Sequence, residues 1–316
     1  MILSHNRHGF AMRKQRRRSS IEKFFLFLLL MGAISAGIYW LFFRSHILIK
    51  NPSSRVSLLS LWEANDYQEL IRVTEEALQL NPMDAENLVF NGFAHFYLGA
   101  NLTITEEKLS HIDAAITSLR RVLLHKKPPL AGEIDYILGK AYFQKGEFYS
   151  DLSIQYMVSA VDRNYIAQDS YEHLGIAYNN IGEYEKSILY LLKANEISPS
   201  DMLYLVLAQV YYQKGDKVLA EEYLDRSINK SNDPSLIQKA RSLLGDIYMQ
   251  AGEYLKAEDQ YLKITQYNPQ NADAHFYLGE IYFELQDPVK ARASWRRANR
   301  IDPNHFGART RLYGRR

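Results

Sequence analysis

The sequence contains no cysteine among its 316 residues. A disulfide framework, a thiol nucleophile, thiolate zinc sites and iron–sulfur clusters are therefore excluded. Proline and glycine are also scarce, at 9 and 16 residues, which argues against a loop-rich or all-β chain. The hydrophobic fraction of 47% and the aromatic fraction of 13% are typical of a folded protein.

Catalytic motifs are missing as well. No GxGxxG, GxSxG or HExxH pattern occurs, and the nine histidines are scattered. The nearest fragment of a phosphate-binding P-loop is Gly139-Lys140, where Ile134 stands in place of the first glycine. Adjacent carboxylates such as Glu221 and Glu222 point to different faces of a helix and cannot share a proton. We therefore predict that the chain is not an enzyme and holds no cofactor and no metal.

Negative charge is scarce at both ends of the chain. Residues 1–55 hold ten Lys and Arg against Glu22, and residues 288–316 hold nine against Asp302. Because the whole chain has a net charge of +2, the 232 residues between these ends carry −15. So acidic a body repels nucleic acid and anionic lipid, and its charge keeps a long surface soluble. We expect no nucleic-acid partner and no small-molecule substrate.

One long apolar run stands near the N-terminus. Residues 24–43 contain no charged side chain, and twenty helical residues at about 1.5 Å each span the ~30 Å core of a bilayer. The residues before this run are more basic than those after it, which predicts a cytoplasmic N-terminus. We therefore predict a basic cytoplasmic tail at 1–23, a transmembrane anchor at 24–43 and a linker at 44–52. A cleaved signal peptide is the alternative, although its apolar core should be shorter.

The rest of the chain repeats one pattern of small and aromatic residues. One copy is Leu174-Gly175, Tyr178, Gly182-Glu183-Tyr184 and Pro199. Its order returns in Leu244-Gly245, Tyr248, Gly252-Glu253-Tyr254, Ala257, Tyr261 and Pro269, and again in Leu278-Gly279, Tyr282, Ala291, Trp295, Ala298 and Pro303. At these residues the chain resembles the tetratricopeptide repeat family, whose unit of about 34 residues is a helix, a turn and a second helix.

The resemblance implies an all-α fold: an N-terminal transmembrane helix followed by a right-handed superhelix, or α-solenoid, of about seven helix-turn-helix repeats. Small residues at the eighth place would let the two helices of a hairpin cross closely. The solenoid is expected over 53–305, with repeats near 51–84, 85–129, 131–167, 168–200, 201–236, 238–271 and 272–305 and a basic cap at 306–316. We expect residues 101–111 to be inserted in the turn of the second unit, and two extra residues near Tyr149 in the third.

In the family, positions two, five, nine, twelve and thirteen of the first helices face a ligand in the concave groove. This transfer implies that the partner-binding residues are Phe93, Phe96, Tyr97, Tyr136, Lys140, Phe143, Gln144, Asn179, Asn180, Gln209, Tyr212, Gln213, Phe276, Glu280 and Phe283. The groove would hold an extended segment, a helix or a neighbouring subunit of another protein. The alternative is that the aromatic residues only complete packing between repeats.

The chain is similar to bacterial inner-membrane proteins with one N-terminal anchor and periplasmic repeats. That resemblance implies a non-enzymatic, single-pass scaffold of the inner membrane, with a cytoplasmic N-terminus and periplasmic repeats that assemble an envelope complex. The periplasmic collar of a flagellar motor is the specific example. The alternative is a chaperone-like holder of translocated polypeptides near a secretion translocon.

Overall fold

The described part of the chain, residues 52–314 of this computed structural model, is built from fifteen α-helices and one short 3₁₀ helix, without a strand. The predicted tail and anchor, residues 1–43, lie outside it. Within the described range no helix has the length and apolar character to cross a membrane. The helices are α2 (Pro52–Glu63), α3 (Tyr67–Leu80), α4 (Ala85–Asn101), α5 (Thr105–Val122), α6 (Ala131–Gln144), η1 (Glu147–Tyr149), α7 (Ser150–Asp162), α8 (Ser170–Asn180), α9 (Tyr184–Ile197), α10 (Asp201–Lys214), α11 (Lys217–Lys230), α12 (Pro234–Ala251), α13 (Tyr254–Tyr267), α14 (Ala272–Glu284), α15 (Pro288–Ile301) and α16 (Phe306–Tyr313).

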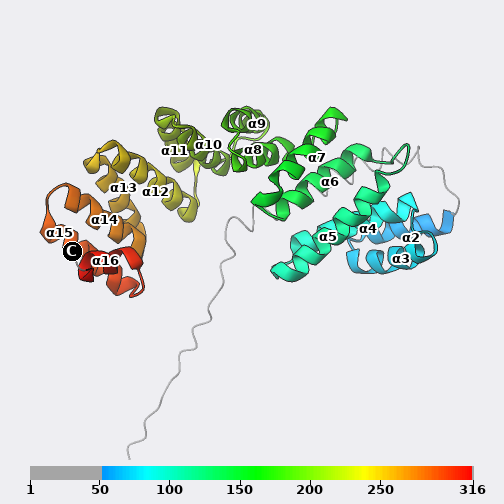
Figure 1. Cartoon of the computed structure of the whole chain (residues 1–316), viewed down its shortest axis with the longest axis horizontal. Coiled ribbons are helices and arrows are strands. Elements are labelled where there is room, and N and C mark those ends of the chain that lie inside the picture. Colours follow the sequence, from blue (N-terminus) through cyan, green and yellow to red (C-terminus); the bar gives the residue numbers. More distant parts are fainter. Residues whose placement is uncertain (1–51, 315–316) are drawn as a thin grey trace, which may run out of the picture. The chain divides into compact units, whose positions relative to one another are not determined.

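Consecutive helices from α2 to α15 pair into seven hairpins, and each hairpin packs on its neighbours along the chain (Figure 1). The predicted all-α solenoid fold is confirmed. Because each hairpin has an apolar side that only a neighbour can cover, the array depends on stacking. The short helix α16 packs against α15 and ends the series.

Local sequence signals set the helix ends. Asp216 caps α11 by accepting a hydrogen bond from the backbone N–H of Leu219, and Asn271 caps α14 in the same way. Gly215 and Gly252 end α10 and α12 with φ of 93° and 75°, a left-handed conformation that favours glycine. α13 ends at Tyr267, just before Asn268-Pro269, because the residue before a proline avoids the α region.

Glycines in the first helices lie where the two helices of a hairpin cross, as the repeat pattern predicts. A Cβ placed on Gly245 would lie 2.6 Å from Cε2 of Tyr261, and one on Gly139 would lie 2.5 Å from Cγ of Met157. The same close approach recurs at Gly92, Gly175 and Gly279. Any larger residue would push the helices apart, so the small residues fix the interhelical distance.

The extra residues of the second and third hairpins form helix and not loop. The insertion predicted at 101–111 lengthens the second hairpin: α4 runs for 17 residues, α5 for 18, and only residues 102–104 separate them. Glu106 and Glu107 in the first turn of α5 suit the positive end of a helix dipole, which favours extending that helix. In the third hairpin the residues around Tyr149 form η1.

Candidate protein-binding face

The predicted binding residues lie on one side of the first helices α4, α6, α8, α10 and α14, which we call the first-helix face. Some of these residues are buried by packing within the chain, and others are exposed and accessible to a partner. Phe93, Phe96 and Tyr97 of α4 are 8%, 0% and 7% exposed, so a partner cannot reach them. Trp62 of the first hairpin covers this side, with ring centroids 6.1 Å from Phe93 and 5.5 Å from Tyr97. These three side chains therefore complete the packing between hairpins, which is the stated alternative, and their binding role stays a prediction.

Tyr136 and Lys140 of α6 are also buried, and both donate hydrogen bonds to a carboxylate of this chain. The Lys140 Nζ atom donates a hydrogen bond to Oδ2 of Asp169 at 2.7 Å, and the Tyr136 hydroxyl donates to Oδ1 at 2.5 Å. Asp169 precedes α8 and is 5% exposed. We call these three residues the internal clamp. Tyr136 and Lys140 therefore pair with a carboxylate inside the chain, and the binding role predicted for them stays a prediction.

The internal clamp carries a charge pair in a dry setting. Burial alone would raise the pKa of Asp169, but the charges of Lys140 and His173 and hydrogen bonds from Lys140 and Tyr136 lower it to about 2. Burial lowers the pKa of His173 below its ordinary value. The ring of Phe143, which is half-buried, packs edge-on against His173 with centroids 4.8 Å apart. Gln144 beside it is also half-buried.

The residues on α8 and α10 form the open part of the face. Asn180, Gln209 and Gln213 are exposed, whereas Asn179 and Tyr212 are half-buried. Gln209 and Gln213 stand four residues apart and therefore share one side of α10. Gln209 and Gln213 present exposed side-chain amides to a partner, whereas Nδ2 of Asn180 donates to the Ser150 hydroxyl at 3.2 Å and leaves its Oδ1 as an acceptor.

Helix α12 extends this open part, although the residue-by-residue transfer left it out. Gly245 lies at the hairpin crossing, so Asp246 and Gln250 take the places that Gln209 and Gln213 have in the preceding hairpin. Gln250 is exposed, and Asp246 is half-buried, with its Oδ1 accepting a hydrogen bond from the Tyr261 hydroxyl at 2.5 Å. Their positions in the repeat, counted from Gly245, could have predicted these two residues from the sequence. We call Asn180, Gln209, Gln213, Asp246 and Gln250 the open face.

The last first helix, α14, is covered by the C-terminal cap. Phe276 packs against His305 with ring centroids 4.9 Å apart, and Glu280 accepts hydrogen bonds from Nε of Arg311 at 2.9 and 3.1 Å. The Arg311 guanidinium also lies 5.1 Å from the ring centroid of Phe283, which remains 44% exposed. Phe276 and Glu280 therefore contact α16 in this chain, and the binding role predicted for them stays a prediction.

Carboxylates with raised pKa values lie along the first helices, and they were not among the predicted residues. Burial raises the pKa of Glu133 on α6 and of Asp246 on α12. Burial, helped by the nearby Asp169 carboxylate, raises the pKa of Glu172 on α8 to about 7. A cationic group of a partner would stabilise the charged form of these acids.

Within residues 52–314, no three His, Asp or Glu side chains gather where they could hold a metal ion. The closest ring-nitrogen pair is that of His95 and His111, whose Nδ1 atoms lie 2.8 Å apart, within hydrogen-bond distance. Burial, with the neighbouring His111 adding to the effect, lowers the pKa of His95 to about 4, in keeping with a neutral ring.

Comparison with known proteins identifies the repeats. Residues 168–201 and 242–306 match models of the tetratricopeptide repeat. A TPR repeat-containing protein of Methanocaldococcus jannaschii is 25% identical over 173 residues, which is 54% of this chain but only 30% of that relative. The C-terminal part of a TPR repeat-containing protein from Cytophaga hutchinsonii has a TM-score of 0.58 at 19% identity, covering 81% of this chain and 98% of that one. The chain thus contains tetratricopeptide repeats in an α-solenoid.

Proposed function

We propose that this chain is a non-enzymatic scaffold that holds partner proteins on its open face. Tetratricopeptide repeats generally serve in protein interaction. The observation that carries the proposal is the row of exposed amides at one place of neighbouring first helices: Asn180 on α8, Gln213 on α10 and Gln250 on α12, with Gln209 one turn before Gln213. Side-chain amides in such a row can donate to and accept from the backbone of an extended segment.

The proposal places the scaffold at a membrane. Residues 24–43 anchor it, the basic residues before them stay in the cytoplasm, and the repeats face the periplasm of a bacterial envelope. The anchor is supported by its twenty uncharged residues and by the excess of Lys and Arg on its N-terminal side. There the array assembles or stabilises an envelope complex, of which the collar of a flagellar motor is the specific candidate.

A photo-crosslinking residue at Gln209 or Gln213 tests the open face in intact membranes. Val218, 78% exposed on the second helix of the same hairpin, is the matched control position. The scaffold predicts a few recurrent partners from Gln209 and Gln213 and none of them from Val218. The same partners from all three positions would contradict the assignment of the face.

The crosslinked set also separates the two functions under consideration. A scaffold yields a short list of partners in fixed proportion, whereas a chaperone-like holder of translocated polypeptides yields many unrelated chains. Deleting residues 24–43 tests the anchor, since the protein should then move from the membrane fraction to the soluble fraction. Retention in the membrane without these residues would refute the anchoring role.

A further inference from the structure

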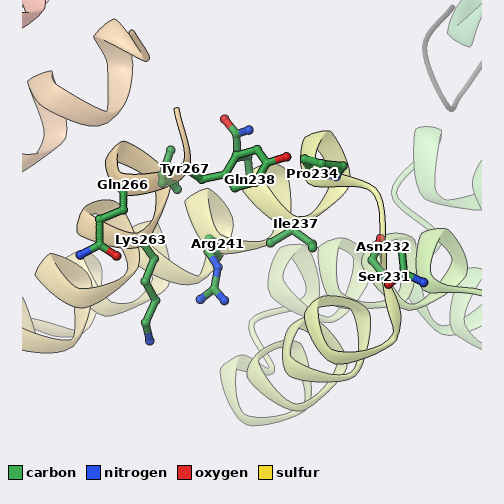
Figure 2. Close-up of a pocket in the computed structure, with 10 residues that line it drawn as sticks. Ser231, Asn232, Pro234, Ile237, Gln238, Arg241, Lys263, Gln266 and Tyr267 are labelled. Carbon is green, nitrogen blue, oxygen red and sulfur yellow. The ribbon is translucent and has the colours of Figure 1, made fainter. Parts of the chain in front are cut away.

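A cavity opens between α12 and α13 of the sixth hairpin and the loop that precedes α12, where the repeat spacing changes. The interval between the crossing residues Ala208 and Gly245 is 37 residues, against 34 between Gly245 and Gly279. The extra residues start α12 one turn early: it begins at Pro234 and runs for 18 residues, whereas α10 has 14. This added turn stands beside the C-terminal end of α13 and forms one wall of the cavity (Figure 2).

The cavity has a volume of about 650 Å³ and a mixed lining. Ile237 on the added turn and Tyr267 at the end of α13 supply apolar surface, and the Tyr267 side chain is 63% exposed. Asn232, Gln238 and Gln266 add amide groups around them. The cavity can therefore take an apolar side chain together with hydrogen bonds to a peptide backbone.

An arginine without a carboxylate partner lies in this lining. Arg241 is half-buried, and its Nη1 atom donates to Oε1 of Gln260 at 3.0 Å. The nearby acid is already taken, because Asp259 accepts from Lys263 at 2.5 Å and from Gln260 at 3.0 Å. Among the described residues no carboxylate pairs with Arg241. Figure 2 shows Arg241 and Lys263 extending to the same side of the cavity.

We propose that this cavity binds an acidic segment of a partner protein, with a Glu or Asp side chain on Arg241 and an adjacent apolar residue between Ile237 and Tyr267. A guanidinium presents paired N–H donors that match the two oxygens of a carboxylate. Only one of the guanidinium's donors is used by Gln260, which leaves others free for the ligand. A single guanidinium in the lining matches one carboxylate, whereas nucleic-acid binding needs many cations.

A selection from random displayed nonapeptides on the full-length chain tests this site. It is run in parallel on Arg241→Gln and on the matched control Arg226→Gln, whose native side chain is half exposed and pairs with Glu222 on the neighbouring helix α11. The wild type and Arg226→Gln should enrich peptides that share an acidic residue next to an apolar one. Arg241→Gln should lose them. Enrichment of the same peptides by Arg241→Gln, or no shared acidic residue, overturns the proposal.

Fluorescence anisotropy with an enriched peptide measures the effect. Loss of a hydrogen-bonded charge pair should weaken binding roughly 10- to 100-fold in Arg241→Gln, with Arg241→Lys in between. Far-UV circular dichroism and crosslinking from Gln209 should stay unchanged in both variants, which separates a binding defect from unfolding and from failure of the open face. Displacement of the peptide by inorganic phosphate as readily as by an excess of the same peptide would show a general oxyanion site and refute a peptide site.

Discussion

Removing one of the two opposite charges of the internal clamp should destabilise the solenoid more than any substitution of a surface ion pair. In Asp169→Asn, the ammonium of Lys140 stays buried beside the Tyr136 hydroxyl, 3.1 Å away, and a neutral amide, and it loses its counter-charge. In Lys140→Met, the carboxylate of Asp169 keeps one hydrogen bond and loses its counter-charge. Each variant leaves one uncompensated charge in a dry place.

The burial of the two side chains determines how much unfolding free energy each variant should lose. The side chains of Lys140 and Asp169 are 8% and 5% exposed, so water cannot replace the missing partner. Removing one partner of such a pair typically costs about 3–5 kcal/mol of unfolding free energy. The double variant Lys140→Met with Asp169→Asn removes both charges and should lose much less than the sum of the singles. We expect a coupling energy of about 2 kcal/mol or more.

Urea denaturation of the full-length chain at pH 7, followed by far-UV circular dichroism, measures the four proteins of this cycle. The matched control is Arg226→Met, since Arg226 and Glu222 are 49% and 48% exposed and their pair should contribute less than about 1 kcal/mol. Single variants that lose less than the control, or a double variant whose loss equals the sum of the two, would refute the reasoning.

Acid titration gives the same cycle a second readout. The pKa of Asp169, about 2, lies below the value of ~3.9 that aspartate has in unfolded chains. A group whose pKa is lowered on folding contributes stability above its unfolded pKa and loses it as the pH falls through its folded pKa. The wild type should therefore lose about 2 kcal/mol more than Asp169→Asn between about pH 4 and pH 2.

Three further changes have defined outcomes. Gly245→Leu should cost about 1–3 kcal/mol, because Tyr261 is held by its hydroxyl and cannot yield, and an unchanged thermal midpoint would contradict the assigned register. Glu172→Gln should raise the free energy of unfolding by about 1–2 kcal/mol at pH 8 and leave it unchanged at pH 4. The pKa of Glu172 is raised on folding to about 7, so this carboxyl makes the wild type less stable as the pH rises toward 7, and the variant lacks that loss. Equal urea midpoints of variant and wild type at pH 8 would exclude this effect. Arg311→Ala should cost about 0.5–1 kcal/mol and speed hydrogen exchange in α14, because Glu280 loses its partner, and protected amides there would count against the cap.

Much of the fold could be predicted from the sequence because the crossing of the two helices in each hairpin requires a small residue at a fixed place. A Gly or Ala recurs where two helices must touch, as at Gly175 and Gly279, and a left-handed glycine ends several first helices, as at Gly215. Helix length was harder to predict. The extra residues of the second hairpin look like a loop when counted against a fixed unit, yet they continue the helical pattern of α5.

The candidate site could be predicted only where no other part of the chain reaches it. Placing Lys140 on the first-helix face was sound, but the sequence does not show that Asp169, 29 positions later on another hairpin, pairs with it. Trp62 likewise covers Phe93 and Tyr97 from a first hairpin that keeps little of the repeat pattern. Position within one repeat decides which side of a helix a residue occupies. Contacts between repeats decide whether that side is open.

Irregular spacing of the crossing residues occurs beside the covered first helices α4 and α6 and also beside the cavity at α12. Gly92 and Gly139 are 47 residues apart, and Gly139 and Gly175 are 36 apart, and here the first helices are covered by Trp62 and by Asp169. Around α10, where the preceding interval is close to 34, the amides stay exposed. Each departure from the repeat length brings extra chain that must pack somewhere. In the second unit it lengthens α4 and α5, and in the third it forms η1, whereas before α12 it adds a turn that forms one wall of the cavity beside Arg241. Irregular intervals are therefore the places where a repeat array gains contacts that the repeat itself does not specify.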